Sequence, residues 1–293
     1  MTSKKVFGFR KSKDALRSGY KDIDIVIRNS TSLNCWERKS SFTSFAQVLA
    51  ANETCEKLRI FGRISSNING AEGAKVIALA LAKNTKLKEL VIRYSLISDE
   101  GAKAISEAIR ENPNSALTSL DLESNEIGPQ GAKEIGLLLR SNKAISKLSL
   151  SRNRIKDAGV INIAVALKEH DSLEVLCLRS CFIGNKGAVQ LADSLKLNNS
   201  LRSFDLAFNL VGDEGAEKLA EAIVMNKTIQ EIKLIFNSFS SRGVDRILSA
   251  FEKNQHIDRI IDEAKFRRCQ DGNFNPPDHD RVHATPVKEY RDY

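Results

Sequence analysis

The chain has 293 residues, of which 42% are hydrophobic and 28% are charged, and its formal net charge is +8. This length and composition are ordinary for a soluble protein with a large core. The apolar stretches are far shorter than the roughly 18 residues that a membrane-spanning helix needs, so we expect no transmembrane helix and no membrane partner.

The basic surplus is most pronounced at the N-terminus, where residues 1–28 contain eight Lys or Arg against three Asp or Glu. We interpret this segment as a solvated and partly disordered leader, with a binding arm as the alternative. The stretches "DIDIVIRN" and "FTSFAQVLAAN" predict one further strand and helix. Residues 1–57 are therefore expected to form a basic leader and an irregular N-terminal capping repeat. The surplus elsewhere is mild and does not indicate a nucleic-acid-binding surface.

The cysteine pattern favours reduced thiols. An odd number of cysteines in a long chain argues against a disulfide framework and for a reducing compartment, so we expect a cytoplasmic protein. No CxxC pair is present, which leaves neither a thioredoxin-like motif nor a zinc ribbon. The five cysteines are Cys35, Cys55, Cys177, Cys181 and Cys269.

Beyond residue 57 the chain repeats itself. Three columns of residues keep a period of 28 residues, with one step of 30, and this indicates a solenoid. The glycine column is Gly73, Gly101, Gly131, Gly159, Gly187, Gly215 and Gly243. A second column is Ser95, Asn125, Asn153, Cys181, Asn209 and Asn237. A third column ends each helical run and is Asn84, Asn112, Asn142, His170, Asn198, Asn226 and Asn254.

Each repeat has two halves of different periodicity. The stretch "LTSLDLESN" alternates and predicts a short strand, and "GAKEIGLLLRSN" has the spacing of an amphipathic helix. A strand and a helix in constant order predict a parallel sheet with helices packed behind it. Strands pack at about 4.8 Å and helices at about 8–10 Å, so the stack should curve into a horseshoe with the sheet on the concave face and the helices on the convex face.

The pattern L-x-x-L-x-L-x-x-N/C-x-L/I followed by a helix resembles the leucine-rich repeat, and the spacing resembles its ribonuclease-inhibitor-like subclass. Relatives of that subclass include the repeat arrays of NOD-like receptors and the Ran GTPase-activating proteins. The resemblance covers seven repeats of an α/β solenoid at residues 58–254. Residues 255–293 are expected to be a C-terminal cap, with a last strand in "HIDRIIDEAKF", and a polar tail.

The repeated columns are expected to be structural. The resemblance implies that the column of Asn153 forms a ladder of side-chain hydrogen bonds to adjacent turns, in which Cys181 serves as a buried weak donor. The glycines are interpreted as permissive backbone points at the helix starts, and the column of Asn142 as left-handed or turn-forming helix stops. His170 is then most simply a turn residue.

Function is expected at positions that the repeat leaves free, on the concave face. These positions include aromatic and arginine side chains, the types enriched at protein-interface hot spots. We expect Phe208 and Phe236, one repeat apart, to form an apolar anchor beside Lys233 and Asp205. The alternative is that one or both rings fold under and cover the core. The candidate partner-binding residues are Arg93, Tyr94, Arg152, Arg179, Phe208, Lys233 and Phe236.

No catalytic, cofactor or metal site is expected. The chain lacks the motifs of P-loop, dinucleotide-binding, zinc-protease and serine-hydrolase sites. His279 and His283, with Asp278 and Asp280, would make at most a weak metal site, and a disordered or strapped-down extension is the preferred interpretation.

The sequence therefore favours a monomeric, non-catalytic scaffold that binds a protein partner on its concave face. One alternative is a GTPase activator similar to the Ran-activating relatives, with Arg152 or Asn153 as candidates by position. Its weakness is the tail, where residues 255–293 hold eight acidic against seven basic residues and thus lack the strongly acidic end of those relatives. Another alternative is an effector that a pathogen or symbiont delivers into a eukaryotic cytosol.

Overall fold

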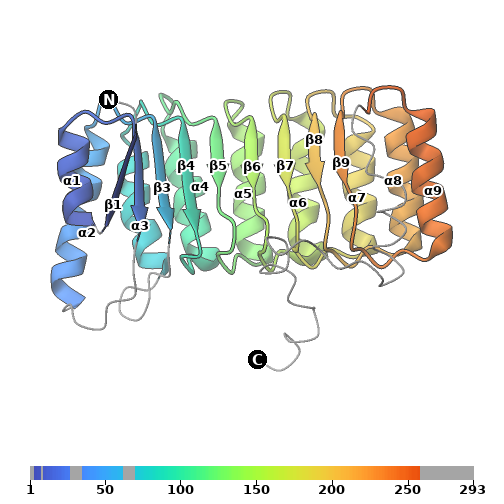
Figure 1. Ribbon diagram of the computed structural model, residues 1–293, viewed down its shortest axis with the longest axis horizontal. Helices are drawn as coiled ribbons and strands as arrows, with labels where there is room; N and C mark the ends of the chain where they lie inside the picture. The colour runs from blue at the N-terminus through green and yellow to red at the C-terminus, as the bar shows by residue number, and fades with distance from the viewer. Residues whose placement is uncertain (1–2, 8, 27–34, 62–69, 258–293) are drawn as a thin grey trace.

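The structure is a computed structural model that describes residues 3–7, 9–26, 35–61 and 70–257. Within these ranges strands and helices alternate along the chain (Figure 1). The strands are β1 Ser3–Phe7, β2 Asp22–Val26, β3 Lys57–Phe61, β4 Glu89–Arg93, β5 Ser119–Asp121, β6 Lys147–Ser149, β7 Val175–Cys177, β8 Ser203–Asp205 and β9 Glu231–Lys233. The helices are α1 Phe9–Arg17, α2 Cys35–Ala50, α3 Gly70–Leu81, α4 Ser98–Glu111, α5 Pro129–Ser141, α6 Lys156–Glu169, α7 Asn185–Leu195, α8 Asp213–Met225 and α9 Ser241–Lys253.

The strands form one parallel sheet whose spatial order is the order of the sequence, from β1 to β9. The helices make a second layer behind it, as Figure 1 shows. Because helices need more width than strands, the stack bends with the sheet on its concave face and the helices on its convex face. The predicted α/β solenoid is confirmed. None of the helices in the described ranges has the length and apolarity required to cross a membrane.

The core runs along the sheet as a continuous stack of apolar side chains. The parallel register places Leu120 beside Leu148, and Leu148 beside Leu176. The stack continues to Phe204 and then to Ile232, and each of these side chains is at most 1% exposed. Residues of one strand parity therefore carry the core, and residues of the other parity line the concave face.

The N-terminal segment differs from the expected leader. Residues 3–26 form β1, α1 and β2, and β2 pairs with β3 in the same register as the later strands. Ala15 and Leu16 of α1 are buried in the common core, whereas Lys11 and Arg17 are exposed. Lys11 and Arg17 therefore lie on the outer face of a helix that packs on the common core. The expected strand and helix around residues 22–52 are present as β2 and α2. The expected last strand and the His279–His283 group lie outside the described residues.

The ladder implied by the resemblance is confirmed at Asn153. Its Oδ1 accepts hydrogen bonds from the backbone N–H groups of Asn125 and Ile127, at 3.0 and 2.9 Å. Its Nδ2 donates to the carbonyls of Leu122 and Leu150, both at 2.9 Å. One amide thus serves two successive repeats, and its buried polar atoms are satisfied.

Cys181 occupies one step of this ladder. Its Sγ lies 3.1 Å from the carbonyl of Leu150, to which it donates. The next step uses Asn209, whose Oδ1 accepts from the N–H of Cys181 at 3.0 Å. Burial raises the pKa of the Cys181 thiol to about 12, so it stays protonated and keeps its hydrogen for donation. The structural role predicted for this cysteine is confirmed.

The expectation of a left-handed backbone fails at the helix stops. Asn142 has an extended conformation, with φ −104° and ψ 118°. It forms a turn instead, because its Oδ1 accepts from the N–H groups of Ala144 and Ile145. His170 does the same in the next repeat: Nδ1 accepts from the N–H of Leu173 at 3.0 Å and Nε2 lies 3.0 Å from the carbonyl of Asn142. The turn-forming part of the prediction is thereby confirmed for both residues.

The repeated glycines are needed for space and not for an unusual backbone. Gly131 lies in the first turn of α5, and its φ is not positive. A Cβ at this position would come within 2.7 Å of both Asp99 Oδ1 and Ile127 Cγ2. Close packing between successive helices therefore selects glycine here, which corrects the expectation of a permissive backbone point.

Candidate protein-binding surface on the concave face

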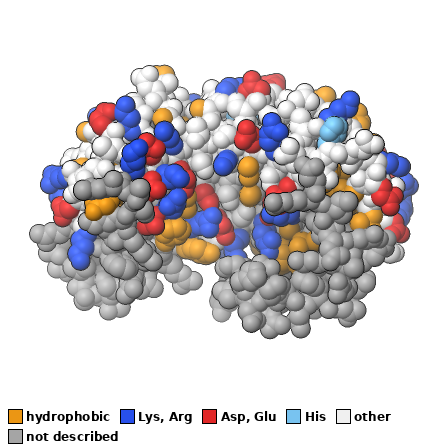
Figure 2. Space-filling view, turned by 45° about the horizontal axis from the view of Figure 1, so that its top comes forward, with side chains coloured by type: hydrophobic (Ala, Val, Ile, Leu, Met, Phe, Trp, Pro, Cys, Tyr) orange, Lys and Arg blue, Asp and Glu red, His pale blue; other side chains and the backbone are white. Residues whose placement is uncertain are grey.

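The molecule is arched around a hollow in which acidic, basic and apolar side chains are mixed (Figure 2). The side chains expected to line the hollow are partly exposed, whereas their neighbours along the chain are buried. Asp121, the last residue of β5, is half-buried, and Leu120 and Leu122 on either side of it are buried. The candidate residues divide into two groups along this face. We call the group with Arg59, Glu89, Arg93, Asp121 and Glu123 the polar half, and the group with Arg152, Arg179, Phe208, Lys233 and Phe236 the aromatic half.

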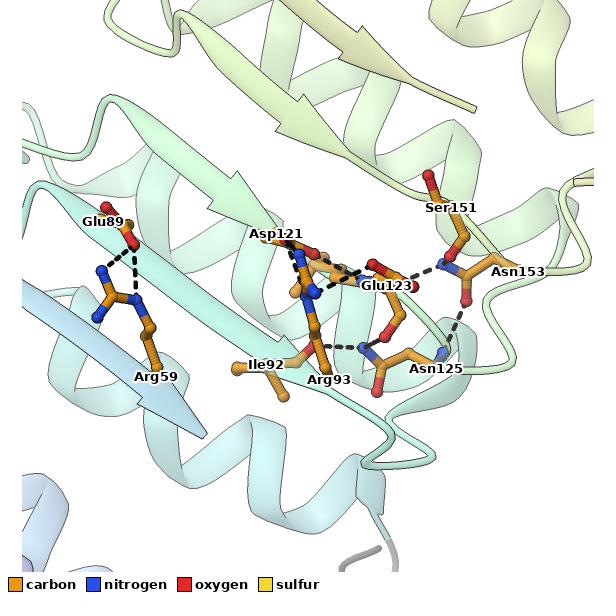
Figure 3. A network of polar contacts seen from close by, with 10 residues as sticks. Arg59, Glu89, Ile92, Arg93, Asp121, Glu123, Asn125, Ser151 and Asn153 are labelled. Atoms are coloured by element: carbon orange, nitrogen blue, oxygen red, sulfur yellow. Dashed lines mark hydrogen bonds and ion pairs between the residues drawn. The ribbon is translucent and has the colours of Figure 1, made fainter. Parts of the chain in front are cut away.

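Arg59 is the residue of the polar half that sequence analysis missed. Its guanidinium lies 2.9 Å from the carboxylate of Glu89 on β4 (Figure 3). It also lies 3.2 Å from the carboxylate of Asp24 on β2. The basic residue thus sits between two acidic ones on neighbouring strands. The sign pattern of the three strands could have revealed this cluster once their register was known.

Arg93 is held in the same way. Its guanidinium contacts Asp121 at 2.5 Å and Glu123 at 3.3 Å, one repeat further along the sheet (Figure 3). A partner that used Arg93 would have to compete with these carboxylates. Tyr94 follows at the end of β4 and is 40% exposed, so its ring remains accessible.

The aromatic half is built around two stacked rings. The ring centroids of Phe208 and Phe236 lie 4.2 Å apart with an angle of 32° between the planes. The guanidinium carbon of Arg179 lies 4.1 Å from the centroid of Phe208, within the range of a cation–π contact. Both rings are only half-buried and lie outside the main hydrophobic core. They therefore form an apolar surface at the ends of the strands and do not fold under to cover the core.

Lys233 and Asp205 lie next to this stack, on adjacent strands and in direct register. Burial raises the pKa of the Asp205 carboxyl, against the lowering effect of its hydrogen bond from Ala207 N–H and of the positive charges of Arg179 and Lys233. Burial also raises the pKa of the Cys177 thiol, to about 12, and the negative charge of Asp205 adds to this effect. The Asp205 carboxyl and the Cys177 thiol are therefore partly removed from water, which disfavours their charged forms.

Arg152 is the residue of the aromatic half that lies nearest to the polar half along the chain of repeats. Its backbone N–H donates to the carbonyl of Arg179 at 2.7 Å, and its side chain is half-buried. Asn153, the other position considered for a GTPase-activating role, is 1% exposed and both its side-chain atoms are used in the ladder. It cannot reach a partner without breaking the stack, so Asn153 is removed from the candidates.

The ends of the strands share a backbone feature that sequence analysis did not foresee. The residue before each ladder position has a left-handed conformation, which L-residues adopt at a cost of about 1–2 kcal/mol. These residues are Tyr94, Ser124, Arg152, Ser180, Phe208 and Phe236, with φ between 56° and 59°. The feature recurs regardless of residue type, so it belongs to the turn of the repeat. Its consequence is that the candidate residues Tyr94, Arg152, Phe208 and Phe236 all occupy the same structural position.

The groups of this surface include guanidiniums, carboxylates, an ammonium, a thiol and aromatic rings. Within the described part of the chain, no cluster of three or more His, Cys, Asp or Glu could hold a metal ion.

Comparisons with known proteins agree with this architecture. A family model described as Leucine Rich repeat matches residues 83–106, 114–136, 141–164 and 197–220. Two proteins of Mus musculus, NACHT, LRR and PYD domains-containing proteins 4C and 4E, are 34% and 32% identical to this chain over 111 residues. Each match covers 38% of this chain and 11% of the relative, so the chain matches about a tenth of the length of these proteins.

Among solved structures, a protein from Bacteroides fragilis superposes with a TM-score of 0.52 at 14% identity, covering 89% of this chain and 77% of that one. This likeness shows the fold alone. The family model thus identifies four segments of the chain as leucine-rich repeats, and the register of the sheet and the asparagine ladder agree with that pattern.

Proposed function

We propose that this leucine-rich-repeat protein is a non-catalytic scaffold that binds a partner protein on its concave face. The observation that carries the proposal is the stack of Arg179, Phe208 and Phe236, which leaves two aromatic rings and a guanidinium half-exposed at the ends of adjacent repeats. Aromatic and arginine side chains dominate the binding energy of protein interfaces. The aromatic half would supply the anchor, and Arg93 and Tyr94 of the other end would extend the contact.

The test is a pull-down from eukaryotic cytosol with the wild type and with Phe208→Ala/Phe236→Ala. We expect partners that the wild type retains to be lost by the double variant, by about tenfold or more in retained amount, since interface hot spots each contribute about 2 kcal/mol or more. Thermal unfolding of the variant should show a small shift, because the rings lie outside the main core.

A matched control removes two large exposed apolar side chains from the helical layer and the segment that follows it. Met225 is the last residue of α8 and Leu197 lies two residues beyond α7, and they are 59% and 61% exposed, so Leu197→Ala/Met225→Ala should keep every concave-face partner. Loss of partners from this control variant, with retention by the double phenylalanine variant, would move the site to the helices. Unfolding of the double phenylalanine variant would show that the rings are core residues.

A further inference from the structure

We propose that the aromatic half binds a short acidic peptide segment that places an apolar side chain on the Phe208 and Phe236 rings and carboxylates on Arg152 and Arg179. This inference rests on the proposed function and names the chemical class of the partner. It depends on how charge is distributed along the concave face, on the hydrogen bond between the two arginines, and on the neighbouring carboxylates, which would repel a nucleic acid.

The arginines of the two halves differ in their pairing. In the polar half, Arg93 has carboxylates at 2.5 and 3.3 Å, and Arg59 is also flanked by two. In the aromatic half, neither Arg152 nor Arg179 forms an ion pair with any carboxylate of the described ranges. These two guanidiniums are the charges of the surface that a ligand can still neutralise.

Arg152 and Arg179 are placed to act together. The N–H of Arg152 donates to the carbonyl of Arg179, so the two residues are neighbours across adjacent repeats. Arg179 also lies over the Phe208 ring, which continues into Phe236. A ligand that contacts the rings therefore lies beside the Arg179 guanidinium, and Arg152 is the backbone neighbour of Arg179 in the preceding repeat. Carboxylate is the group that guanidinium binds with paired, charge-assisted hydrogen bonds.

The other charges near the rings do not cancel this positive character. Asp205 interacts with Arg179 and Lys233, but its Oδ1 accepts the N–H of Ala207 at 2.9 Å and the carboxyl is largely buried. Lys233 is already 3.3 Å from Glu231 on its own strand. Arg152 and Arg179 therefore remain the charges to be matched, and an apolar peptide without carboxylates would bury them at a cost.

The neighbouring surface limits the length and the class of the ligand. Asp121 and Glu123 of the polar half are half-buried one repeat before Arg152. A nucleic-acid strand that continued past the aromatic half would meet these carboxylates and be repelled, because its phosphates are evenly spaced. A peptide avoids this conflict, since its acidic residues can end where the arginines end. Charge complementarity therefore favours a peptide over a nucleic acid.

The experiment selects ligands from a displayed library of short random peptides on the immobilised full chain. We expect enriched sequences with net negative charge and at least one Phe, Tyr, Trp or Leu. An enriched peptide, synthesised with fluorescein, should bind about tenfold or more weakly to Arg152→Glu/Arg179→Glu, and binding should weaken as salt rises. Arg152→Gln/Arg179→Gln removes the two charges without reversing them and should give an intermediate loss of affinity. This variant carries the test if the glutamate variant folds poorly.

The charge-matched control is Arg140→Glu/Lys168→Glu, at exposed basic residues in the last turns of α5 and α6, and it should bind as the wild type does. The acidic-peptide inference would be overturned by any of three results. These are enrichment of neutral or basic peptides, a selection that enriches no peptide, and unchanged binding of the enriched peptide by both double arginine variants. If a labelled single-stranded oligonucleotide binds the chain more tightly than the enriched acidic peptide does, the inference would be overturned in favour of nucleic acid. If non-acidic peptides enrich and bind through Phe208 and Phe236, the proposed function survives and only the acidic-peptide inference fails. If the enriched peptides bind equally well to every concave-face variant, both the inference and the proposed function are wrong.

Discussion

At the scale of single residues, His170 shows how one structural role accepts different chemistry. Nδ1 accepts a hydrogen bond from a backbone N–H, so in the folded protein the proton of the neutral ring must be on Nε2, which donates to the carbonyl of Asn142. The ring thus makes the same two kinds of contact as the asparagines of its column, for example Asn198. Unlike them, it can titrate.

His170 predicts a pH dependence of stability. Burial is the main cause that lowers the pKa of this histidine, and the charge of Lys143 adds to it. As pH falls below about 6.5 the unfolded chain gains a proton that the folded ring still refuses, so the free energy of unfolding falls, until the pH reaches the lowered pKa. We expect His170→Asn to lose this part of the dependence. Urea unfolding of both proteins at about pH 7.5 and pH 5.5 measures this dependence. If the free energy of unfolding falls by the same amount between the two pH values in both proteins, the prediction is wrong.

Cys177 is half-buried on the concave face, yet it should react slowly. Its pKa is raised to about 12 by burial, with a further contribution from the charge of Asp205, so little thiolate exists near neutral pH. Iodoacetamide at about pH 8 should modify Cys177 far more slowly in the folded chain than in urea, where the thiol has its ordinary pKa of about 8.5. Peptide mass spectrometry follows this site separately from the other cysteines. Similar rates in both conditions would show that the thiol is not desolvated.

At the scale of elements, successive helices are linked by caps supplied from the preceding repeat. Asp157 at the start of α6 accepts hydrogen bonds from the N–H groups of Gly184 and Gly187 at the start of α7, at 2.7 and 3.0 Å. Asn185 does the same for α8, with Gly212 at 2.7 Å. The caps satisfy N–H groups that have no partner within their own helix, and the carboxylates also complement the helix dipole.

This capping predicts a graded effect at residue 157. Asp157→Ala should lower the free energy of unfolding by about 1 kcal/mol, as the loss of a helix cap does elsewhere. Asp157→Asn should cost less than half of that, because Asn185 makes equivalent hydrogen bonds in the next repeat. Urea unfolding of the two variants gives the comparison. If Asp157→Asn is as damaging as Asp157→Ala, the charge and not the hydrogen bonds provides the stabilisation.

The sequence predicts a structural feature of the repeat where the same residue type recurs at a position. It does not predict one where different residue types serve the same structural role. The glycine column keeps its residue, and the two asparagine columns keep theirs except at Ser95, Cys181 and His170, so the repeat, its period and the ladder follow from the sequence. The capping position holds Asp99, Pro129, Asp157, Asn185 and Asp213 in successive repeats, and this variety hides a shared function. Pro129 has no side-chain acceptor, and α6 accordingly begins in a different way, with Lys156 in the left-handed region.

At the scale of the whole molecule, strand parity predicts which side chains face the concave surface but not how they pair. The pairing of Arg59 with Asp24 depends on the register of β2 against β3, which the residues of a predicted strand do not specify. The half-exposure of Phe208 and Phe236 depends on the left-handed turn at each strand end, which no residue type in that column signals. The sequence therefore identifies the surface, and the register of the sheet decides which of its charges remain unpaired.

The one-dimensional stack also predicts how the molecule unfolds. Leu148 is 1% exposed and lies between Leu120 and Leu176 in the core. A carboxylate there would be buried without a partner, so Leu148→Asp should cost about 4 kcal/mol locally. Because each repeat contacts only its neighbours, this loss should separate the repeats on either side and turn one unfolding transition into two.

Urea unfolding followed by circular dichroism, with hydrogen exchange read by mass spectrometry, tests this prediction. Protection should be lost first in α5 and α6, while α3 and α9 retain it. Lys147→Asp is the matched control, because Lys147 is exposed on the same strand, and it should keep a single transition. If Leu148→Asp instead lowers protection evenly along the chain, coupling between distant repeats is stronger than nearest-neighbour contacts provide, and the stack unfolds as one unit.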